Sequence, residues 1–337
     1  MSLNKRLFGQ GPVESGAYAF KALNFTGNGG TNAVTGVGFA PDIVWIKDTD
    51  TGYQHNIYDT SRGTGAAGFA LEPSGTANEY TLSGLTAFGS DGFTVGSNAG
   101  NNQASSPNLA FCWGVNGGTT STDTNGSINS TVQVNQAGGV SIVKFTGNQT
   151  AGATVGHGLG VAPDFILMTN RTRNGYGWYT YNSVSGATKN LVFNTADAEA
   201  TSTAAWNDTE PTSTVFSLGS DTGPNSSGYP YIAYCFANKS GQQKFGEYTA
   251  NGGGSNNAIT GLGFQPDFLI LRNKGSDNWR MYNSARNLIL YPNLNNSGDG
   301  CCNQGHVSFD SDGFTLLSDN NNAPSGRKHL YLAWKNS

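Results

Sequence analysis

Charge is scarce in this chain of 337 residues, and long apolar runs are missing. Only 12% of the residues are charged, and the 18 lysines and arginines are spread thinly in a chain with a formal net charge of −4. Without a basic stripe, we expect no binding to nucleic acid and none to a polyanionic membrane surface. The apolar runs at 43–46 and 268–271 are far shorter than the roughly 20 residues that span a bilayer, so no membrane insertion is expected.

The chain also shows no export signal and has few cysteines. Its first residues, MSLNKRLFGQGP, lack the apolar segment of about 7 to 15 residues that a secretory signal needs, which predicts synthesis in the cytoplasm. Four cysteines are too few for a small disulfide scaffold. Cys112 and Cys235 occupy the same point of two related segments and are expected to be buried thiols. Cys301 and Cys302 are adjacent in a loop, where we expect reduced thiols rather than a strained disulfide.

Recognisable catalytic and metal-binding patterns are missing too. The four histidines are His55, His157, His306 and His329. None of them forms part of a short-spaced zinc motif. The segment FDSDGF from Phe309 is only faintly similar to a calcium loop, because it lacks the downstream glutamate. With no nucleophile elbow and no phosphate loop either, the sequence predicts no catalytic residues, no metal and no cofactor.

Glycine and turn-forming residues are what the chain has in abundance. It contains 48 glycines, and Asn, Ser, Thr and Asp fill most of the space between short apolar runs. Glycine supplies the positive φ that tight turns need and is costly inside helices. This composition predicts an all-β protein built from many short strands joined by turns.

One ten-residue segment recurs twice more along the chain. GFAPDIVWIK begins at Gly38, GVAPDFILMT at Gly160 and GFQPDFLILR at Gly263. The proline–aspartate pairs in these segments are Pro41 and Asp42, Pro163 and Asp164, and Pro266 and Asp267. A tyrosine with a small polar pair, a phenylalanine strand and a closing strand follow each pair in the same order. This recurrence indicates one structural unit repeated three times.

The repeat sets the predicted domain boundaries. We predict three tandem antiparallel β-sandwich modules of jelly-roll type, each about 100 residues long, at 18–118, 140–241 and 243–337. Residues 1–17 precede the first module. Small polar residues dominate 119–139, which we interpret as a linker.

The proline–aspartate pair predicts a corner that leads into a buried strand. Proline fixes φ and biases its predecessor towards extended backbone, so the pair enters a turn or the end of a strand. The aspartate can then accept backbone N–H groups across that turn. The apolar run that follows has no polar alternation, which predicts burial on both faces, between the two sheets of one module.

Two other roles are open to the aspartates, catalysis and ion pairing. As general bases, or as a glycosidase pair, they would need a second carboxylate about 5 to 10 Å away. Each aspartate lies in a separate module without one, so we favour the structural corner. A variant of the corner pairs Asp42 with Arg62 and Asp267 with Arg286, while the middle module has Ser185 in place of the arginine.

Aromatic residues are the remaining candidates for recognition. Trp206 lies in AAWNDTEPTS, where the modules diverge and where a sandwich carries its loops. Exposed aromatic rings stack on sugars. Trp206 is therefore our candidate for contact with a surface ligand.

The combined motifs resemble a known class of proteins. G-F-x-P-D before an apolar strand, then Y-D/N-S-x-R, F-D-S-D-G-F-T and a closing Y-L-A-W or A-F-C-W, is similar to the repeated modules of tail-fibre and other virion-surface proteins of tailed bacteriophages. The resemblance covers nearly the whole chain after residue 18. It implies a structural and adhesive role on the virion surface, homo-oligomers with a trimer favoured, and a host-surface glycan or receptor as partner.

The first residues fit this interpretation. Lys5, Arg6, Leu7 and Phe8 precede the repeats and are expected to anchor the chain to a portal, tail or capsid protein of the particle. The alternatives are a capsid decoration or fibre protein of the same phage type, a glycan-binding lectin-like protein, and, least favoured, a polysaccharide depolymerase.

Overall fold

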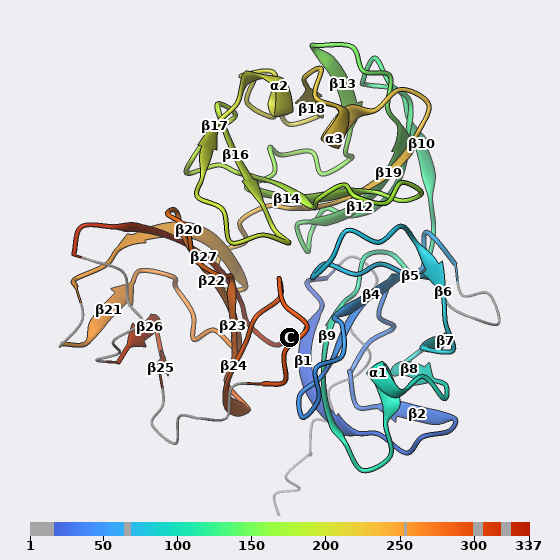
Figure 1. Ribbon diagram of the computed structural model, residues 1–337, viewed down its shortest axis with the longest axis vertical. Coiled ribbons are helices and arrows are strands. Elements are labelled where there is room, and N and C mark those ends of the chain that lie inside the picture. Colours follow the sequence, from blue (N-terminus) through green and yellow to red (C-terminus); the bar gives the residue numbers. More distant parts are fainter. Residues whose placement is uncertain (1–16, 64–68, 253–254, 299–305, 318–324) are drawn as a thin grey trace, which may run out of the picture.

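The computed structural model describes residues 17–63, 69–252, 255–298, 306–317 and 325–337. Nearly all of the regular structure in these ranges is antiparallel β-sheet, which confirms the all-β prediction. Only three short helices interrupt the described strands: α1 (Ala99–Asn102), α2 (Thr203–Trp206) and α3 (Thr222–Asn225). The sheets gather in three lobes around a common centre, which we call lobe 1 (17–118), lobe 2 (119–241) and lobe 3 (242–337) (Figure 1).

Lobe 1 contains a large sheet in the order β1-β9-β3-β4, a smaller sheet β2-β8-β7 and the hairpin β5-β6. Its strands are β1 (Phe20–Thr26), β2 (Asn32–Thr35), β3 (Ile43–Asp48), β4 (Asn56–Asp59), β5 (Phe69–Ala70), β6 (Tyr80–Thr81), β7 (Leu85–Gly89), β8 (Gly92–Val95) and β9 (Pro107–Trp113). The closing strand β9 lies between the first strand and the strand that follows the proline–aspartate pair.

Lobes 2 and 3 repeat this order. Lobe 2 has β10 (Ser121–Asp123), β11 (Ser130–Asn135), β12 (Val140–Thr146), β13 (Ala153–Gly156), β14 (Phe165–Asn170), β15 (Tyr179–Asn182), β16 (Lys189–Val192), β17 (Ala200–Thr201), β18 (Val215–Leu218) and β19 (Pro230–Phe236). Lobe 3 has β20 (Gln243–Thr249), β21 (Asn257–Thr260), β22 (Phe268–Asn273), β23 (Arg280–Asn283), β24 (Arg286–Leu290), β25 (Val307–Asp310), β26 (Gly313–Leu316) and β27 (Lys328–Trp334). Their large sheets contain β12-β19-β14-β15 and β20-β27-β22-β23 as the counterparts of β1-β9-β3-β4.

The register repeats as well as the order. Ile43 pairs with Trp113, Phe165 with Phe236, and Phe268 with Trp334. In each lobe, the residue after the aspartate is therefore opposite the last residue of the closing strand.

The interpretation of 119–139 as a linker was wrong. This segment contains β10 and β11, and β11 pairs with β12, so the hairpin extends the large sheet of lobe 2 to eight strands. Val132 faces its own lobe's core, whereas its neighbours Thr131 and Gln133 point to the other side of the sheet. Small polar residues hid this strand alternation, because composition alone does not distinguish a linker from an edge hairpin.

The strand after each proline–aspartate pair is buried along its whole length, as predicted. The placement of both faces inside one sandwich was wrong. In β3, Val44 and Ile46 join the core of lobe 1, whereas Ile43 and Trp45 join a central core that all three lobes share. Strands β14 and β22 alternate in the same way between the central core and their own lobe's core.

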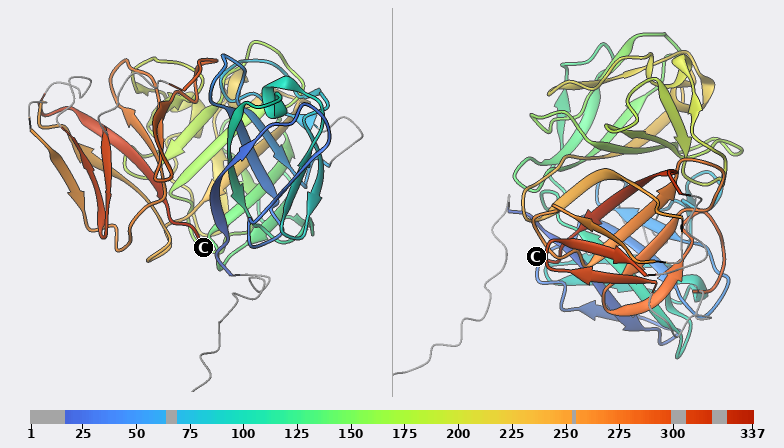
Figure 2. Two further views of the ribbon diagram at one scale, coloured as in Figure 1. Left: turned by 90° about the horizontal axis from the view of Figure 1, so that it is seen from below. Right: turned by 90° about the vertical axis from the view of Figure 1, so that its left-hand side faces the viewer.

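Aromatic rings from all three lobes fill the central core. Trp334 of lobe 3 lies 5.8 Å from Trp113 of lobe 1 and 5.8 Å from Phe236 of lobe 2, measured between ring centroids. Phe111 of lobe 1 stacks on Phe268 of lobe 3 at 3.9 Å. The two further views in Figure 2 show the three lobes packed side by side. The second apolar face of each large sheet is thus covered by the other two lobes.

Backbone contacts close the three lobes into a ring. The side chain of Asn238, two residues after β19, accepts the N–H of Phe245 in β20 at 2.7 Å. Asn336 accepts the N–H of Ala22 in β1 at 2.8 Å, and the N–H of Ser337 donates to the Phe20 carbonyl. The residues after β27 therefore join β1 in the way that the residues after β19 join β20.

Candidate functional site

The proline–aspartate corner is most elaborate in lobe 1. Asp42 is buried, and its carboxylate accepts the four successive backbone N–H groups of residues 115–118 at 2.7–2.9 Å. The Thr60 hydroxyl donates to the same carboxylate at 2.9 Å. The Asp42 N–H in turn donates to the carbonyl of Trp113. One side chain thus ties the start of β3 to the end of β9 and to the turn after β4.

The other two corners are reduced versions of the first. Asp164 accepts the Ser183 hydroxyl at 3.0 Å and the N–H of Asn238 at 2.7 Å. Asp267 accepts the Ser284 hydroxyl at 2.9 Å and, at 2.8 Å, the N–H of Asn336. These contacts occupy equivalent positions in the three lobes and hold the scaffold together.

Neither predicted ion pair forms. Arg62 pairs with Asp59 rather than with Asp42, because Asp59 lies only three residues away on the same turn and its carboxylate reaches Nε at 2.5 Å. Arg286 donates to the Thr49 hydroxyl of lobe 1 at 2.8 Å instead of pairing with Asp267. Backbone N–H groups and hydroxyls satisfy both aspartates, so the corners need no arginine.

The unequal corners predict unequal losses of stability. Asp42→Ala leaves four N–H groups of a buried turn without their acceptor, and we expect it to lower the free energy of unfolding by about 3–5 kcal/mol. Asp164→Ala removes two contacts at a half-buried position, for an expected loss of about 1–2 kcal/mol. Denaturant unfolding of both variants measures the difference. Equal losses would contradict the assignment of the larger brace to Asp42.

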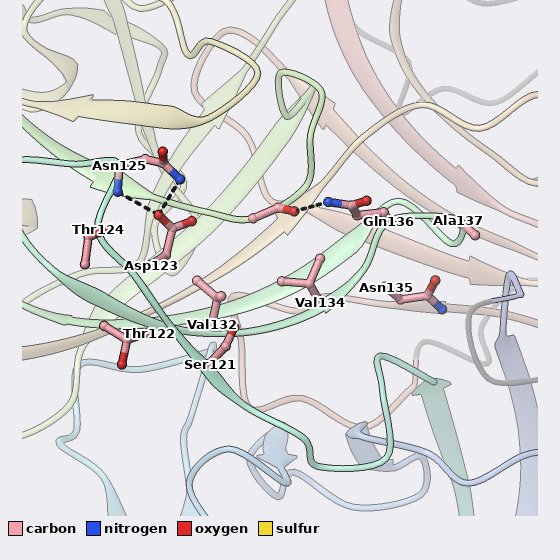
Figure 3. A pocket seen from close by; sticks show the side chains of 11 residues that line it. Ser121, Thr122, Asp123, Thr124, Asn125, Val132, Val134, Asn135, Gln136 and Ala137 are labelled. Atoms are coloured by element: carbon pink, nitrogen blue, oxygen red, sulfur yellow. Dashed lines mark hydrogen bonds between the residues drawn. The ribbon is translucent and has the colours of Figure 1, made fainter.

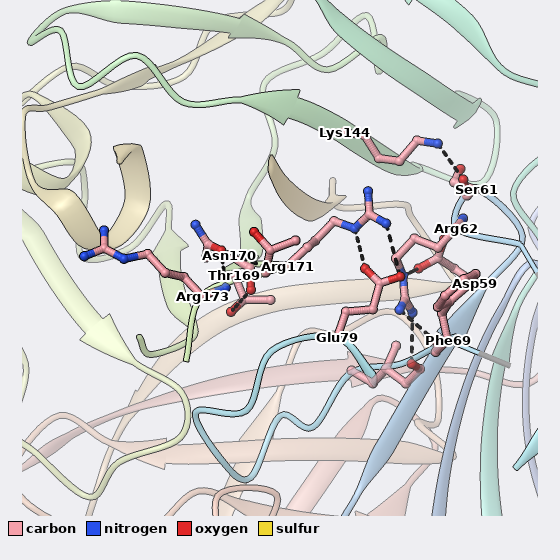
Figure 4. Close-up of polar contacts among 12 residues, drawn as sticks. Asp59, Ser61, Arg62, Phe69, Glu79, Lys144, Thr169, Asn170, Arg171 and Arg173 are labelled. Atoms are coloured by element: carbon pink, nitrogen blue, oxygen red, sulfur yellow. Dashed lines mark hydrogen bonds and ion pairs between the residues drawn. The ribbon is translucent and has the colours of Figure 1, made fainter. Parts of the chain in front are cut away.

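A buried polar cluster lies where lobe 1 meets lobe 2 (Figure 4). Asp59 and Arg62 are both buried, and Arg62 also donates to the carbonyls of Ile57 and Phe69 at 2.9 Å. The Tyr234 hydroxyl from lobe 2 donates to Asp59 at 2.7 Å. Burial acts to lower the pKa of the Arg62 guanidinium, but Asp59, Tyr234 and Glu79 together outweigh this effect and the pKa is raised. Asp59 and Arg62 are therefore a buried ion pair within the scaffold, at the boundary of lobes 1 and 2.

A second ion pair crosses the same boundary. Arg171 of lobe 2 contacts Glu79 of lobe 1 at 2.5 Å, and the two residues also share a backbone hydrogen bond (Figure 4). Both charges of this pair are neutralised within the protein.

Trp206 is not a surface residue. It ends α2, is 1% exposed, and packs against Tyr181 and Phe216 in the core of lobe 2. The prediction that it contacts a surface ligand was therefore wrong. Divergence from the repeat correctly marked a loop, but this loop folds back and covers its own lobe.

Histidine burial gives the protein a pH dependence. His329 is 3% exposed and stacks on Tyr248, and burial lowers its pKa from 6.5 to about 4. Burial also lowers the pKa of His55 and of His157. The folded protein therefore holds these rings neutral at pH values where an unfolded chain would protonate them.

The sign of this effect predicts acid lability. Between pH 6.5 and about 4 the unfolded chain binds a proton at His329 that the folded chain does not, so stability falls as the pH falls. The loss at this one residue is about 3 kcal/mol. His329→Asn, which introduces the residue found at the equivalent position 108 of lobe 1, should make the unfolding free energy less dependent on pH over this range. An unchanged slope would contradict the prediction.

Cys112 and Cys235 are buried free thiols, as predicted. Burial raises the pKa of both, to about 12 for Cys235, so neither is poised as a nucleophile. The anchor residues Lys5, Arg6, Leu7 and Phe8 lie outside the described residues, as do Cys301 and Cys302.

An open groove of about 580 Å³ lies beside the hairpin β10-β11 (Figure 3). Its floor contains Val132 and Val134, and polar side chains line its walls. Asp123 accepts from the backbone and side chain of Asn125, and Gln136 donates to the carbonyl of Gly158 at 2.8 Å. The groove offers hydroxyl and amide groups suited to a polar ligand.

A second exposed site lies on the turn after β14. The Arg173 guanidinium carbon is 4.2 Å from the centroid of the Tyr176 ring and 4.8 Å from that of Tyr229. Tyr229 is 37% exposed. Sequence analysis missed this cluster. The signal was an arginine close to a tyrosine in RTRNGYG, because the equivalent segment of the first repeat, TDTGYQ from Thr49, has the Gly-Tyr pair without the arginine.

Two other kinds of site are missing from the part of the chain that the structure describes. Within the ranges given above, no group of three or more His, Cys, Asp or Glu side chains could hold a metal ion. No helix in those ranges is long and apolar enough to cross a membrane.

Comparison with known protein families shows which family the chain belongs to. Residues 14–337 match the family described as "Domain of unknown function (DUF7483)". No curated protein and no solved structure gives a significant match. Since the match covers nearly the whole sequence, the chain belongs to this family.

Proposed function

We propose that this member of the family is a structural, non-catalytic protein on the surface of a tailed bacteriophage, and that it acts as a tail-fibre or adhesin-type component in host attachment. The proposal rests on the structural role of the polar residues that recur in the three repeats. All three corner aspartates are engaged in bracing turns and strand ends. The repeat therefore preserves a scaffold, and recognition is left to the loops that differ between lobes.

The compact ring supports an outward location. A shared aromatic centre and interlocked backbone contacts join the three lobes, which favours resistance to local opening and to proteolysis. A component displayed outside a particle needs such resistance. The anchor at Lys5, Arg6, Leu7 and Phe8 and a homotrimeric assembly belong to the proposal on the strength of the sequence resemblance.

Particle association tests this proposal. The full chain should co-purify with intact particles of a phage that encodes it, and an antibody against lobe 2 should reduce adsorption to host cells. A chain without residues 1–16 should fold but fail to enter particles. Recovery of the protein only from host lysate, with particles lacking it, would overturn the proposal.

Capsid decoration is the second candidate, because it shares the need for a durable outward scaffold. Immunogold labelling separates the two locations, since tail labelling supports the fibre and head labelling supports decoration.

A further inference from the structure

We propose that Arg173, Tyr176 and Tyr229 form a binding site for the acidic group of a negatively charged glycan. The inference rests on the proposed adhesive function and names the class of ligand. Its basis is a cation that packs against two aromatic rings, Tyr176 on the same turn and Tyr229 before β19, where the turn itself does not require an arginine.

The turn itself belongs to the repeated scaffold. Asn170 at the end of β14 accepts the N–H groups of Thr172 and Arg173 at 2.9 Å. Asp48 and Asn273 make corresponding side-chain contacts to the backbone two residues on, in the other lobes. Lobe 1 forms the same turn with Thr51 in the place of Arg173, although Tyr53 follows Gly52 there as Tyr176 follows Gly175. The turn therefore does not require the arginine, and Arg173 is an addition to the scaffold.

The guanidinium is fixed in position but retains most of its hydrogen-bonding capacity. Its Nη1 donates to the hydroxyl of Ser226 at 2.6 Å, and the two rings pack against its carbon. Guanidinium has five N–H donors, and this is the one side-chain hydrogen bond it makes within the described residues. Arg173 is only half-buried, so the remaining donors can reach a ligand.

The charge of Arg173 is not neutralised within the described part of the chain. No carboxylate there lies within ion-pair distance of it, whereas the nearby Arg171 is paired with Glu79. Figure 4 shows the two arginines extending in different directions, Arg171 towards Glu79 and Arg173 away from the lobe boundary. Arg173 is therefore a preorganised, uncompensated cation in a protein with a net negative charge.

The ligand chemistry follows from these groups. An arginine fork binds the two oxygens of a carboxylate or phosphate in parallel, with more specificity than a lysine. Beside it, the exposed ring of Tyr229 offers an apolar surface and a hydroxyl suited to a sugar. Together these groups fit an acidic sugar unit, and they offer less to a neutral one.

Calorimetric titration of the purified full chain tests the assignment. The probes are a short oligogalacturonate, a neutral galactose oligosaccharide of equal length, and a phosphorylated oligosaccharide. We expect binding to at least one acidic probe that weakens with salt, and little binding to the neutral one. The carboxylated and phosphorylated probes distinguish the two sources of the acidic group.

Three variants locate the binding. Arg173→Gln should weaken it by about 10- to 100-fold, and Arg173→Lys should recover only part of the loss. Lys189→Gln, which removes the same charge elsewhere on lobe 2, should leave affinity unchanged. Thermal unfolding verifies that each variant is folded.

Three results would overturn the site: no binding to either acidic probe, equal binding of the neutral probe, or equal loss in Arg173→Gln and Lys189→Gln. Because these measurements use the free chain, they are independent of particle association. A chain that enters particles but binds no acidic glycan would overturn this inference and leave the proposed function intact.

Discussion

Trp334→Ala is expected to lower the free energy of unfolding by about 3–5 kcal/mol and to loosen all three lobes together. Trp334 is 2% exposed and lies in the last strand of lobe 3. Its ring is 5.2–6.1 Å from rings of lobe 1 (Phe20), lobe 2 (Phe236) and lobe 3 (Phe268). Removing it opens a cavity that no single lobe can fill.

Hydrogen exchange distinguishes this shared loss from a local one. In Trp334→Ala, amides of β9, β19 and β27 should all exchange faster, because these central strands contribute to the same core. Trp206→Ala also removes a buried tryptophan, but from the core of lobe 2 alone, so its effect should concentrate there. Faster exchange confined to lobe 3 in Trp334→Ala would show that the lobes open independently.

A conservative variant separates ring packing from polarity. The indole N–H of Trp334 is buried and has no hydrogen-bond partner among the residues that the structure describes. Trp334→Phe keeps an aromatic ring and removes that N–H, so its cost should be well below that of Trp334→Ala. A similar cost for both would mean that the size of the indole, rather than an aromatic centre, is what matters.

The fold class could be predicted because it depends on local chemistry. Glycine-rich turns and short apolar runs indicated an all-β protein, and the proline at Pro41 with the short carboxylate of Asp42 indicated a braced corner. The absence of alternation in IVWI correctly indicated burial on both faces. The partner of the second face could not be predicted, since a run of apolar residues does not specify which surface covers it.

The errors at individual residues have the same origin. The place of Arg62 in the repeat suggested a pair with Asp42. Asp59 is only three residues from Arg62, however, and its carboxylate binds the guanidinium instead. Trp206 was placed on the surface because its segment diverges, yet side-chain burial depends on how a loop folds back. Arg173 was missed because comparison of the repeats concentrated on what they share.

The buried pair at the boundary of lobes 1 and 2 leads to the second large effect. Arg62→Met should lower the free energy of unfolding by about 3–5 kcal/mol, because it leaves the Asp59 carboxylate buried without its cation. The carbonyls of Ile57 and Phe69 also lose the Arg62 donor, although Ile57 keeps the N–H of Leu71. Denaturant unfolding measures the loss. As a control, Arg286→Met removes a half-buried arginine that, within the described ranges, makes one side-chain hydrogen bond, to Thr49, and it should cost less than about 1 kcal/mol.

Removing both charges tests whether the pair itself stabilises the fold. Asp59→Leu combined with Arg62→Met eliminates the uncompensated carboxylate, and we expect the double variant to be more stable than Arg62→Met alone. Recovery should be incomplete, because the Tyr234 hydroxyl then loses the acceptor that ties lobe 2 to lobe 1 at 2.7 Å. If the free-energy losses of Asp59→Leu and Arg62→Met instead add in the double variant, the two residues are not energetically coupled. That result would contradict the assignment of a stabilising ion pair at this lobe boundary.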